Sequence, residues 1–82
     1  MSPRLLHALL TELSTIPPGY LYPAAALRSA VRWAVVPQPT YAEIDTAITH
    51  LEQLRHITTI HNPLCGTRHS ITDSGRAALA TL

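Results

Sequence analysis

Residues 69–79 read HSITDSGRAAL, and this stretch decides the fold. It begins at the end of an apolar, β-branched run that includes Ile71, and it continues as an alanine-rich segment. Thr72 stands at the junction, where its hydroxyl oxygen is suited to accept a hydrogen bond from a backbone N–H of a first helical turn. The sequence therefore predicts a strand over residues 68–72, followed at once by a short helix that Thr72 caps and that ends at Leu82.

Upstream of this junction the chain has the pattern of a β-hairpin. Residues 57–60, ITTI, are all β-branched, which favours a strand. Residues 62–67, NPLCGT, contain Asn, Pro and Gly, which are typical of turns. We therefore expect two antiparallel strands joined by this turn, the second of which leads into the last helix.

The first helix is predicted to open with Ser2 as its N-cap and Pro3 at its first helical position. Leucines then recur at helical spacing and give the helix a broad apolar face. Residues 17–19, PPG, end it, because neither proline nor glycine continues a helix well. Residues 20–22, YLY, follow as a short extended piece that could pair at the edge of a sheet.

Two further helices are predicted before the hairpin. The second covers residues 23–35 and starts at a proline, which has the backbone angle of a first helical residue. Residues 37–39, PQP, end it, since the residue before a proline avoids helical angles. Thr40, with Glu43 three residues later, forms a capping box that starts the third helix.

The third helix is predicted to have an apolar face and a polar face. Its inward stripe consists of Ile44, Ala47, Ile48, Leu51 and Leu54. Its outward positions are Tyr41, Asp45, Thr46, Thr49, His50 and Gln53. We expect the inward stripe to be buried together with Leu6, Leu9, Leu10, Leu13, Leu27, Val31, Ile57 and Ile71.

Two helices joined by a tight break and followed by a hairpin form the pattern of a winged helix-turn-helix. Residues 44–79, with LEQL at 51–54 and ITDSGRAAL at 71–79, resemble the MarR- and PadR-type winged-helix regulators. The resemblance implies one α+β, mostly helical domain over residues 1–82. It would have a three-helix core, a two-stranded β wing and a short C-terminal helix.

The resemblance also assigns structural roles to single residues. It implies that Ile71 anchors the returning strand to the core, that Gly75 lets the last helix pack closely, and that Arg76 begins the exposed side of this helix. Relatives commonly carry a glycine after the third helix, whereas this chain has Arg55 and His56 there. The third helix must therefore end without the usual left-handed glycine.

The function that the resemblance implies is binding of double-stranded DNA, with the third helix in the major groove. The residues expected to contact DNA are Tyr41, Thr46, Thr49, His50, Gln53 and Arg68, with Asp45 on the same face. Gln53 could pair with adenine, because its amide offers one donor and one acceptor side by side. Arg68 is expected on the wing, where an arginine contacts phosphate or the minor groove.

The charge of the chain favours a different function. The 82 residues include six arginines and no lysine, and the formal net charge is only +1. Proteins that bind nucleic acid usually have a clear basic excess. Glu43, Asp45 and Glu52 also place three carboxylates on the third helix, where they would repel DNA. The alternative is a winged-helix module for protein interaction or self-association that does not bind DNA.

The second helix is apolar on two sides, with Trp33 on the side away from Leu27 and Val31. One interpretation is that Tyr20 and Tyr22 fold over Trp33, and the other is that Trp33 lies in a protein interface. Because a chain with few charges should not leave apolar side chains open, we expect a homodimer. The residues expected in its interface are Trp33, Val36, Leu79 and Leu82.

Other kinds of site are not expected. His61, Cys65 and His69 are spaced four apart around the turn, but a structural zinc needs four ligands and no fourth one accompanies them. We therefore expect exposed wing histidines, a loop cysteine of no special role and no bound metal. No nucleophile–base pair or glycine-rich phosphate loop is present, so the sequence predicts neither an enzyme nor a cofactor or small-molecule ligand.

The cellular location is predicted from what the sequence lacks. A single cysteine cannot form an internal disulfide, which favours a reducing compartment. No apolar run approaches membrane-spanning length, and the first residues do not have the pattern of a signal peptide. We expect a cytoplasmic protein without a membrane partner.

Overall fold

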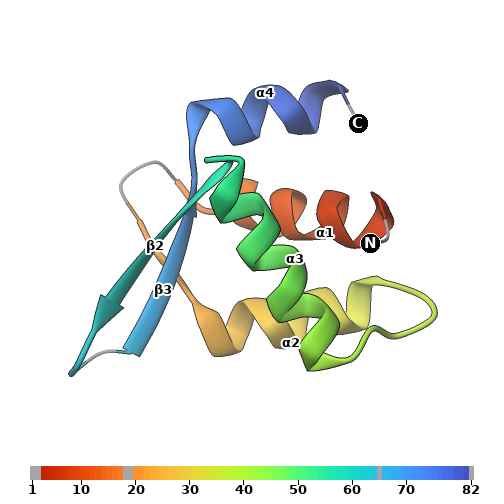
Figure 1. The fold of residues 1–82 in the computed structure, drawn as a ribbon, viewed down its shortest axis with the longest axis horizontal. Helices are drawn as coiled ribbons and strands as arrows, with labels where there is room; N and C mark the ends of the chain where they lie inside the picture. Colours follow the sequence, from red (N-terminus) through yellow and green to blue (C-terminus); the bar gives the residue numbers. More distant parts are fainter. Residues whose placement is uncertain (1–2, 18–19, 65, 82) are drawn as a thin grey trace.

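The last helix packs against the first helix, which also packs against the second helix, the third helix and the hairpin (Figure 1). The computed structural model describes residues 3–17, 20–64 and 66–81. Its elements in chain order are α1 (Pro3–Ser14), β1 (Tyr22–Pro23), α2 (Ala24–Ala34), α3 (Tyr41–Gln53), β2 (Ile57–Asn62), β3 (Gly66–Ile71) and α4 (Asp73–Thr81). Within these described ranges the fold is α+β, with four helices and one three-stranded antiparallel sheet.

The sheet has the strand order β1-β3-β2. The predicted hairpin is confirmed, and its register runs from the pair Ile57 and Ile71 to the pair Asn62 and Gly66. β1 lies on the other side of β3, with Tyr22 opposite His69. The predicted pairing of this extended piece at a sheet edge is thus confirmed at Tyr22, and it adds a third strand to the two strands of the hairpin.

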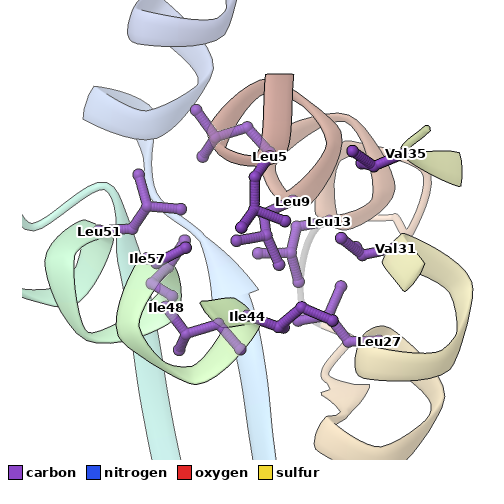
Figure 2. Packing of buried hydrophobic residues seen from close by; sticks show 12 residues of the cluster. Leu5, Leu9, Leu13, Leu27, Val31, Val35, Ile44, Ile48, Leu51 and Ile57 are labelled. Carbon is purple, nitrogen blue, oxygen red and sulfur yellow. The ribbon is translucent and has the colours of Figure 1, made fainter. Parts of the chain in front are cut away.

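The core lies where α1 crosses α2, α3 and the start of the hairpin (Figure 2). Each fully buried leucine or isoleucine side chain stabilises the fold by roughly 1.5–3 kcal/mol. The buried residues are Leu5, Leu9, Leu10, Leu13, Leu27, Val31, Val35, Ile44, Ala47, Ile48, Leu51 and Ile57. The predicted core is therefore confirmed for most positions, while Leu6 and Ile71 are partly buried and pack against it.

Leu54 does not belong to this core. Its side chain is 48% exposed, so its predicted place in the inward stripe is wrong. The physical reason is that α3 ends one residue earlier, at Gln53. Leu54 is the C-cap, and the chain turns away from the helix axis directly after it.

The end of α3 has the hydrogen bonds of a Schellman motif. The backbone N–H of Arg55 donates to the carbonyl oxygen of Glu52, and that of His56 donates to the carbonyl oxygen of Leu51, both at 3.0 Å. Arg55 has a φ of 61°, which is the left-handed conformation that usually requires glycine. The helix therefore closes in the usual geometry with an arginine at the glycine position.

The junction at Thr72 has the predicted structure. The Thr72 hydroxyl oxygen accepts a hydrogen bond from the Gly75 N–H at 3.0 Å, and the hydroxyl donates to the carbonyl oxygen of Arg55 at 2.7 Å. Gly75 is buried, and a Cβ at this position would overlap the carbonyl oxygen of His56. The expectation that Gly75 allows close packing of α4 is confirmed.

The aromatic residues are arranged differently from the prediction. Trp33 is 76% exposed and Tyr20 is 67% exposed, while the Tyr22 hydroxyl donates to Glu12 Oε2 at 3.1 Å. The interpretation in which the two tyrosines fold over Trp33 is therefore wrong. Leu79 packs against the core rather than lying open for an interface, and Leu82 lies outside the described residues.

Candidate nucleic-acid interface

The first turn of α3 is fixed by the capping box that the sequence predicts. The Glu43 N–H donates to Thr40 Oγ1 at 3.2 Å, and the Thr40 N–H donates to Glu43 Oε1 at 3.1 Å. Two backbone donors at the start of the helix are satisfied in this way. The Glu43 carboxylate is consequently turned back toward Thr40 instead of pointing outward along the helix.

The outer face of α3 is polar and open. Thr46, Thr49 and Gln53 are exposed and His50 is half-buried, so the outward orientation predicted for them is confirmed. Together with Asp45 they line a surface hollow of about 410 Å³. The structure thus brings four of the residues predicted to contact DNA together on one helix face.

The two threonines of this face use their hydroxyl hydrogens within the helix. Thr46 Oγ1 donates to the carbonyl oxygen of Ala42 at 2.9 Å, and Thr49 Oγ1 donates to that of Asp45 at 3.0 Å. What each threonine offers outward is therefore a hydroxyl oxygen as acceptor and a methyl group. The Gln53 side chain makes no hydrogen bond within the described ranges, so both its donor and its acceptor are available.

Two carboxylates of α3 lie at or near this face: Asp45 lines the same hollow, and Glu52 lies on the side toward the hairpin. Asp45 Oδ2 is 3.2 Å from Arg28 Nη2, and this ion pair neutralises one negative charge. Glu52 lines a groove between α3 and the hairpin, where its charge acts on His69. The repulsion of DNA that the sequence suggests is therefore reduced, although it is not removed.

The groove between α3 and the hairpin has a volume of about 260 Å³. Its hairpin wall carries two pairs of a hydroxyl and an imidazole from neighbouring strands. Thr59 Oγ1 lies 2.9 Å from His69 Nδ1, and Thr67 Oγ1 lies 3.0 Å from His61 Nδ1. No pattern in the sequence predicts this groove, because the groove depends on which face of the hairpin turns toward α3.

His69 is the buried member of these pairs, with 4% of its surface exposed. Burial lowers the pKa of His69 below its ordinary value of 6.5 because it disfavours the charged imidazolium, and nearby Glu52 acts in the opposite direction. The expectation that the wing histidines are exposed is therefore wrong for His69, while it is confirmed for His61.

Arg68 does not join the α3 face. Its directly opposite partners are Ile60 in β2 and Pro23 in β1, whereas Thr59 and His69 line the groove next to α3. Because successive side chains of a strand point to opposite faces, Arg68 lies on the face turned away from that groove. It stands in the hairpin as predicted, on the sheet face opposite the groove, and its contact with phosphate or the minor groove stays a prediction.

Two arginines that the sequence analysis did not select lie next to α3. Arg28 and Arg32 of α2 place their guanidinium groups over the Tyr41 ring, at 4.7 and 4.9 Å from its centroid. They are spaced four residues apart and so share one side of α2. That spacing is visible in the sequence and was the signal that could have identified them.

Metal binding has no support among the residues that the structure describes, where no group of three His, Cys, Asp or Glu side chains could hold an ion. Cys65, which the sequence pattern places between the two wing histidines, lies outside those residues. No helix in the described part of the chain is long and apolar enough to span a membrane.

Comparison with known proteins gives no identification. No protein-family model, no curated protein and no solved structure significantly matches this chain. Its function is therefore inferred from its residues and their geometry.

Proposed function

We propose that this chain is a winged helix-turn-helix protein that binds double-stranded DNA with α3 in the major groove. One observation carries the proposal, namely the open polar row of Thr46, Thr49, His50 and Gln53 on α3. The order of helix, strand, helix, helix and hairpin supports it, because α3 then lies beside a hairpin in the position of a wing (Figure 1).

The chemistry of this row favours adenine–thymine base pairs. Gln53 can donate to N7 and accept from the N6 amino group of adenine, which gives a bidentate contact. Thr46 and Thr49 present acceptors and methyl groups, and these suit an amino group of adenine or cytosine and the methyl group of thymine. Discrimination is expected to depend chiefly on Gln53, whose amide has no partner among the described residues.

The cations around α3 are few, which sets the expected strength of binding. Arg28 is paired with Asp45, and Arg68 faces away from the groove beside α3. Arg4 lines a hollow between α1 and the end of α2, and Arg76 lines another hollow at the start of α4, so both lie on other surfaces. A monomer therefore contacts few phosphates, so its affinity should be low and should depend only weakly on salt concentration.

The direct test is fluorescence polarisation of labelled duplexes at low salt with protein at tens of micromolar, after selection of a preferred site from a randomised duplex pool. Gln53→Ala should reduce discrimination between the selected site and a scrambled one by roughly 1–3 kcal/mol. Thr11→Ala, an exposed threonine of α1, is the matched surface control and should leave discrimination unchanged. The absence of binding to any duplex under these conditions would refute the proposal.

A second candidate function is association with another protein without DNA. The observation that favours it is the exposure of Trp33 and Val36, each of which is 76% exposed. Val36 also lines a hollow of about 500 Å³ between the first turns of α1 and the end of α2. Isolated exposed apolar side chains are normal, but an exposed tryptophan close in sequence to an exposed valine is typical of an interface, where aromatic side chains are enriched. This candidate becomes the preferred one if no duplex binds.

A further inference from the structure

The charged groups around Tyr41 form a cluster that has no role in the fold's core. We call Arg28, Arg32 and Tyr41 the arginine–tyrosine cluster. Both guanidinium groups lie within 5 Å of the centroid of the same ring, which holds two like charges near one another at the start of α3. Each guanidinium gains attraction from the ring face, but this attraction does not neutralise either charge.

The cluster has fewer acceptors than its donors require. Asp45 pairs with Arg28, whereas Arg32 has no carboxylate partner among the described residues. The Nε–H groups of both arginines are buried without an acceptor in the same part of the chain. Each guanidinium group has five N–H donors, but the two groups together have only one carboxylate partner among the described residues. The cluster therefore keeps a net positive charge.

We infer that the arginine–tyrosine cluster binds a phosphate group. Planar guanidinium groups bind phosphate oxygens through paired N–H donors, and stacking on an aromatic ring fixes their orientation in advance. Two neighbouring arginines can then share one dianion or phosphodiester that neither would hold firmly alone. Tyr41 also brings a hydroxyl group to the same location.

The position of the cluster indicates that this phosphate belongs to the DNA backbone, and this step rests on the proposed function. Tyr41 is the first residue of the helix that would enter the major groove, and the polar row begins five residues later at Thr46. A helix in the major groove has phosphates along both rims of the groove, and contacts to them fix its register without reading sequence. Arg28 and Arg32 would supply that contact from α2.

The first experiment measures duplex binding against salt concentration. Arg32→Ala should weaken binding to every duplex by a similar factor, leave the ratio between selected and scrambled sites unchanged, and reduce the slope of log K against log salt by about 1. Arg32→Lys should keep most of the slope, because it keeps the charge. Arg4→Ala removes an arginine on another surface and should leave affinity and slope as in the wild type.

The second experiment separates phosphate binding from DNA binding. Inorganic phosphate is titrated against the full chain while the arginine Nε–H resonances are followed by NMR, with sodium chloride at matched ionic strength as the control. In the wild type we expect saturable shifts of the Arg28 and Arg32 resonances. In a folded Arg32→Ala variant, the Arg28 resonance should no longer shift. Thermal unfolding of that variant verifies that it is folded.

The outcomes distinguish this inference from the proposed function. If the wild type binds duplex DNA and Arg32→Ala binds with the same affinity and salt slope, the cluster is not a phosphate site and the proposed function stands. If no duplex binds but phosphate produces saturable shifts, the phosphate site stands and its ligand is not DNA. If neither duplex nor phosphate binds, both proposals are overturned.

Discussion

His69 carries an imidazole that is almost fully buried and bonded to the Thr59 hydroxyl within the hairpin. An imidazole in this position is more stable in its neutral form, because the charged form loses hydration that the protein does not fully replace. Its ionisation therefore differs between the folded and unfolded chain, and the stability of the fold must depend on pH.

The sign of this dependence follows from the lowered pKa of His69. Well above pH 6.5 the residue is neutral in both states and has no effect, whereas around and below this pH the unfolded chain binds the proton more readily than the folded chain. The free energy of unfolding should thus fall as the pH drops below 6.5 and through the lower pKa of the folded state. Urea unfolding at pH 7.5 and pH 5.0 measures this loss.

A His69→Gln variant provides the control for that experiment, since glutamine can bond Thr59 but does not titrate. The loss of stability on acidification should be smaller in this variant than in the wild type. Asp45 and Glu52 raise the pKa of His69 and His61 lowers it, so His61→Gln should also reduce the loss, though by less. An equal loss in the wild type and in His69→Gln would show that His69 is not the group responsible.

Among the elements, α3 shows which structural features the sequence predicts and which it does not. Its start, its buried stripe and its polar face follow from local rules, namely the capping box and the helical period. Its last turn does not, because the exposure of Leu54 depends on Arg55 taking a left-handed conformation. A non-glycine residue rarely adopts that conformation, so the sequence predicted a stripe that continues to Leu54, whereas the buried stripe ends at Leu51.

The hairpin has a second feature that the sequence does not predict, namely which of its faces turns toward α3. The β-branched run and the turn residues identify both strands, and the alternation of side chains along each strand is certain. Which set of side chains faces α3 is decided by the tertiary packing of Ile57 and Ile71 against the core. The sequence therefore identified Arg68 as a wing arginine but could not place it on the face turned away from α3.

The end of α3 gives a prediction at the scale of the element. Arg55→Gly should raise the free energy of unfolding by up to about 1 kcal/mol, because a left-handed conformation costs an L-residue roughly 1–2 kcal/mol and glycine loses part of that gain as chain entropy. For a domain of this size, that gain corresponds to a rise of roughly 4–8 °C in the midpoint of thermal unfolding.

Arg55→Ala is the matched control, since alanine removes the same side chain but has the same difficulty with a positive φ. It should leave stability close to that of the wild type. A glycine variant that is less stable than the alanine variant would mean that the left-handed backbone at this position carries no penalty.

At the scale of the whole molecule, the exposed apolar side chains predict self-association. Trp33 and Val36 are exposed, and Val36 lines a hollow that is bordered by the first turn of α1. A second copy of this chain is the partner we expect on this surface. Two copies would also double the number of phosphates that can be reached, which compensates for the low charge of one copy.

Sedimentation at high micromolar concentration tests this expectation. The wild type should sediment as a dimer, and Trp33→Lys should weaken the dimer by roughly 2 kcal/mol or more, as the loss of a central interface tryptophan usually does. Leu64→Lys changes a residue that is 95% exposed in the hairpin turn and does not line the hollow at Val36, and this variant should leave the dimer intact. A monomeric wild type under these conditions would contradict the prediction.

Arg32 and Trp33 are neighbours in the chain, but the helical twist of α2 turns them toward different surroundings. The Arg32 guanidinium lies over the ring of Tyr41 at the start of α3, while the Trp33 side chain is exposed to solvent. An amino-acid replacement at one of these positions therefore need not disturb the other. Substitutions at Trp33 could therefore change which protein the chain binds without changing the phosphate site proposed at Arg32. The two functions could then evolve separately, although their residues lie within one turn of the same helix.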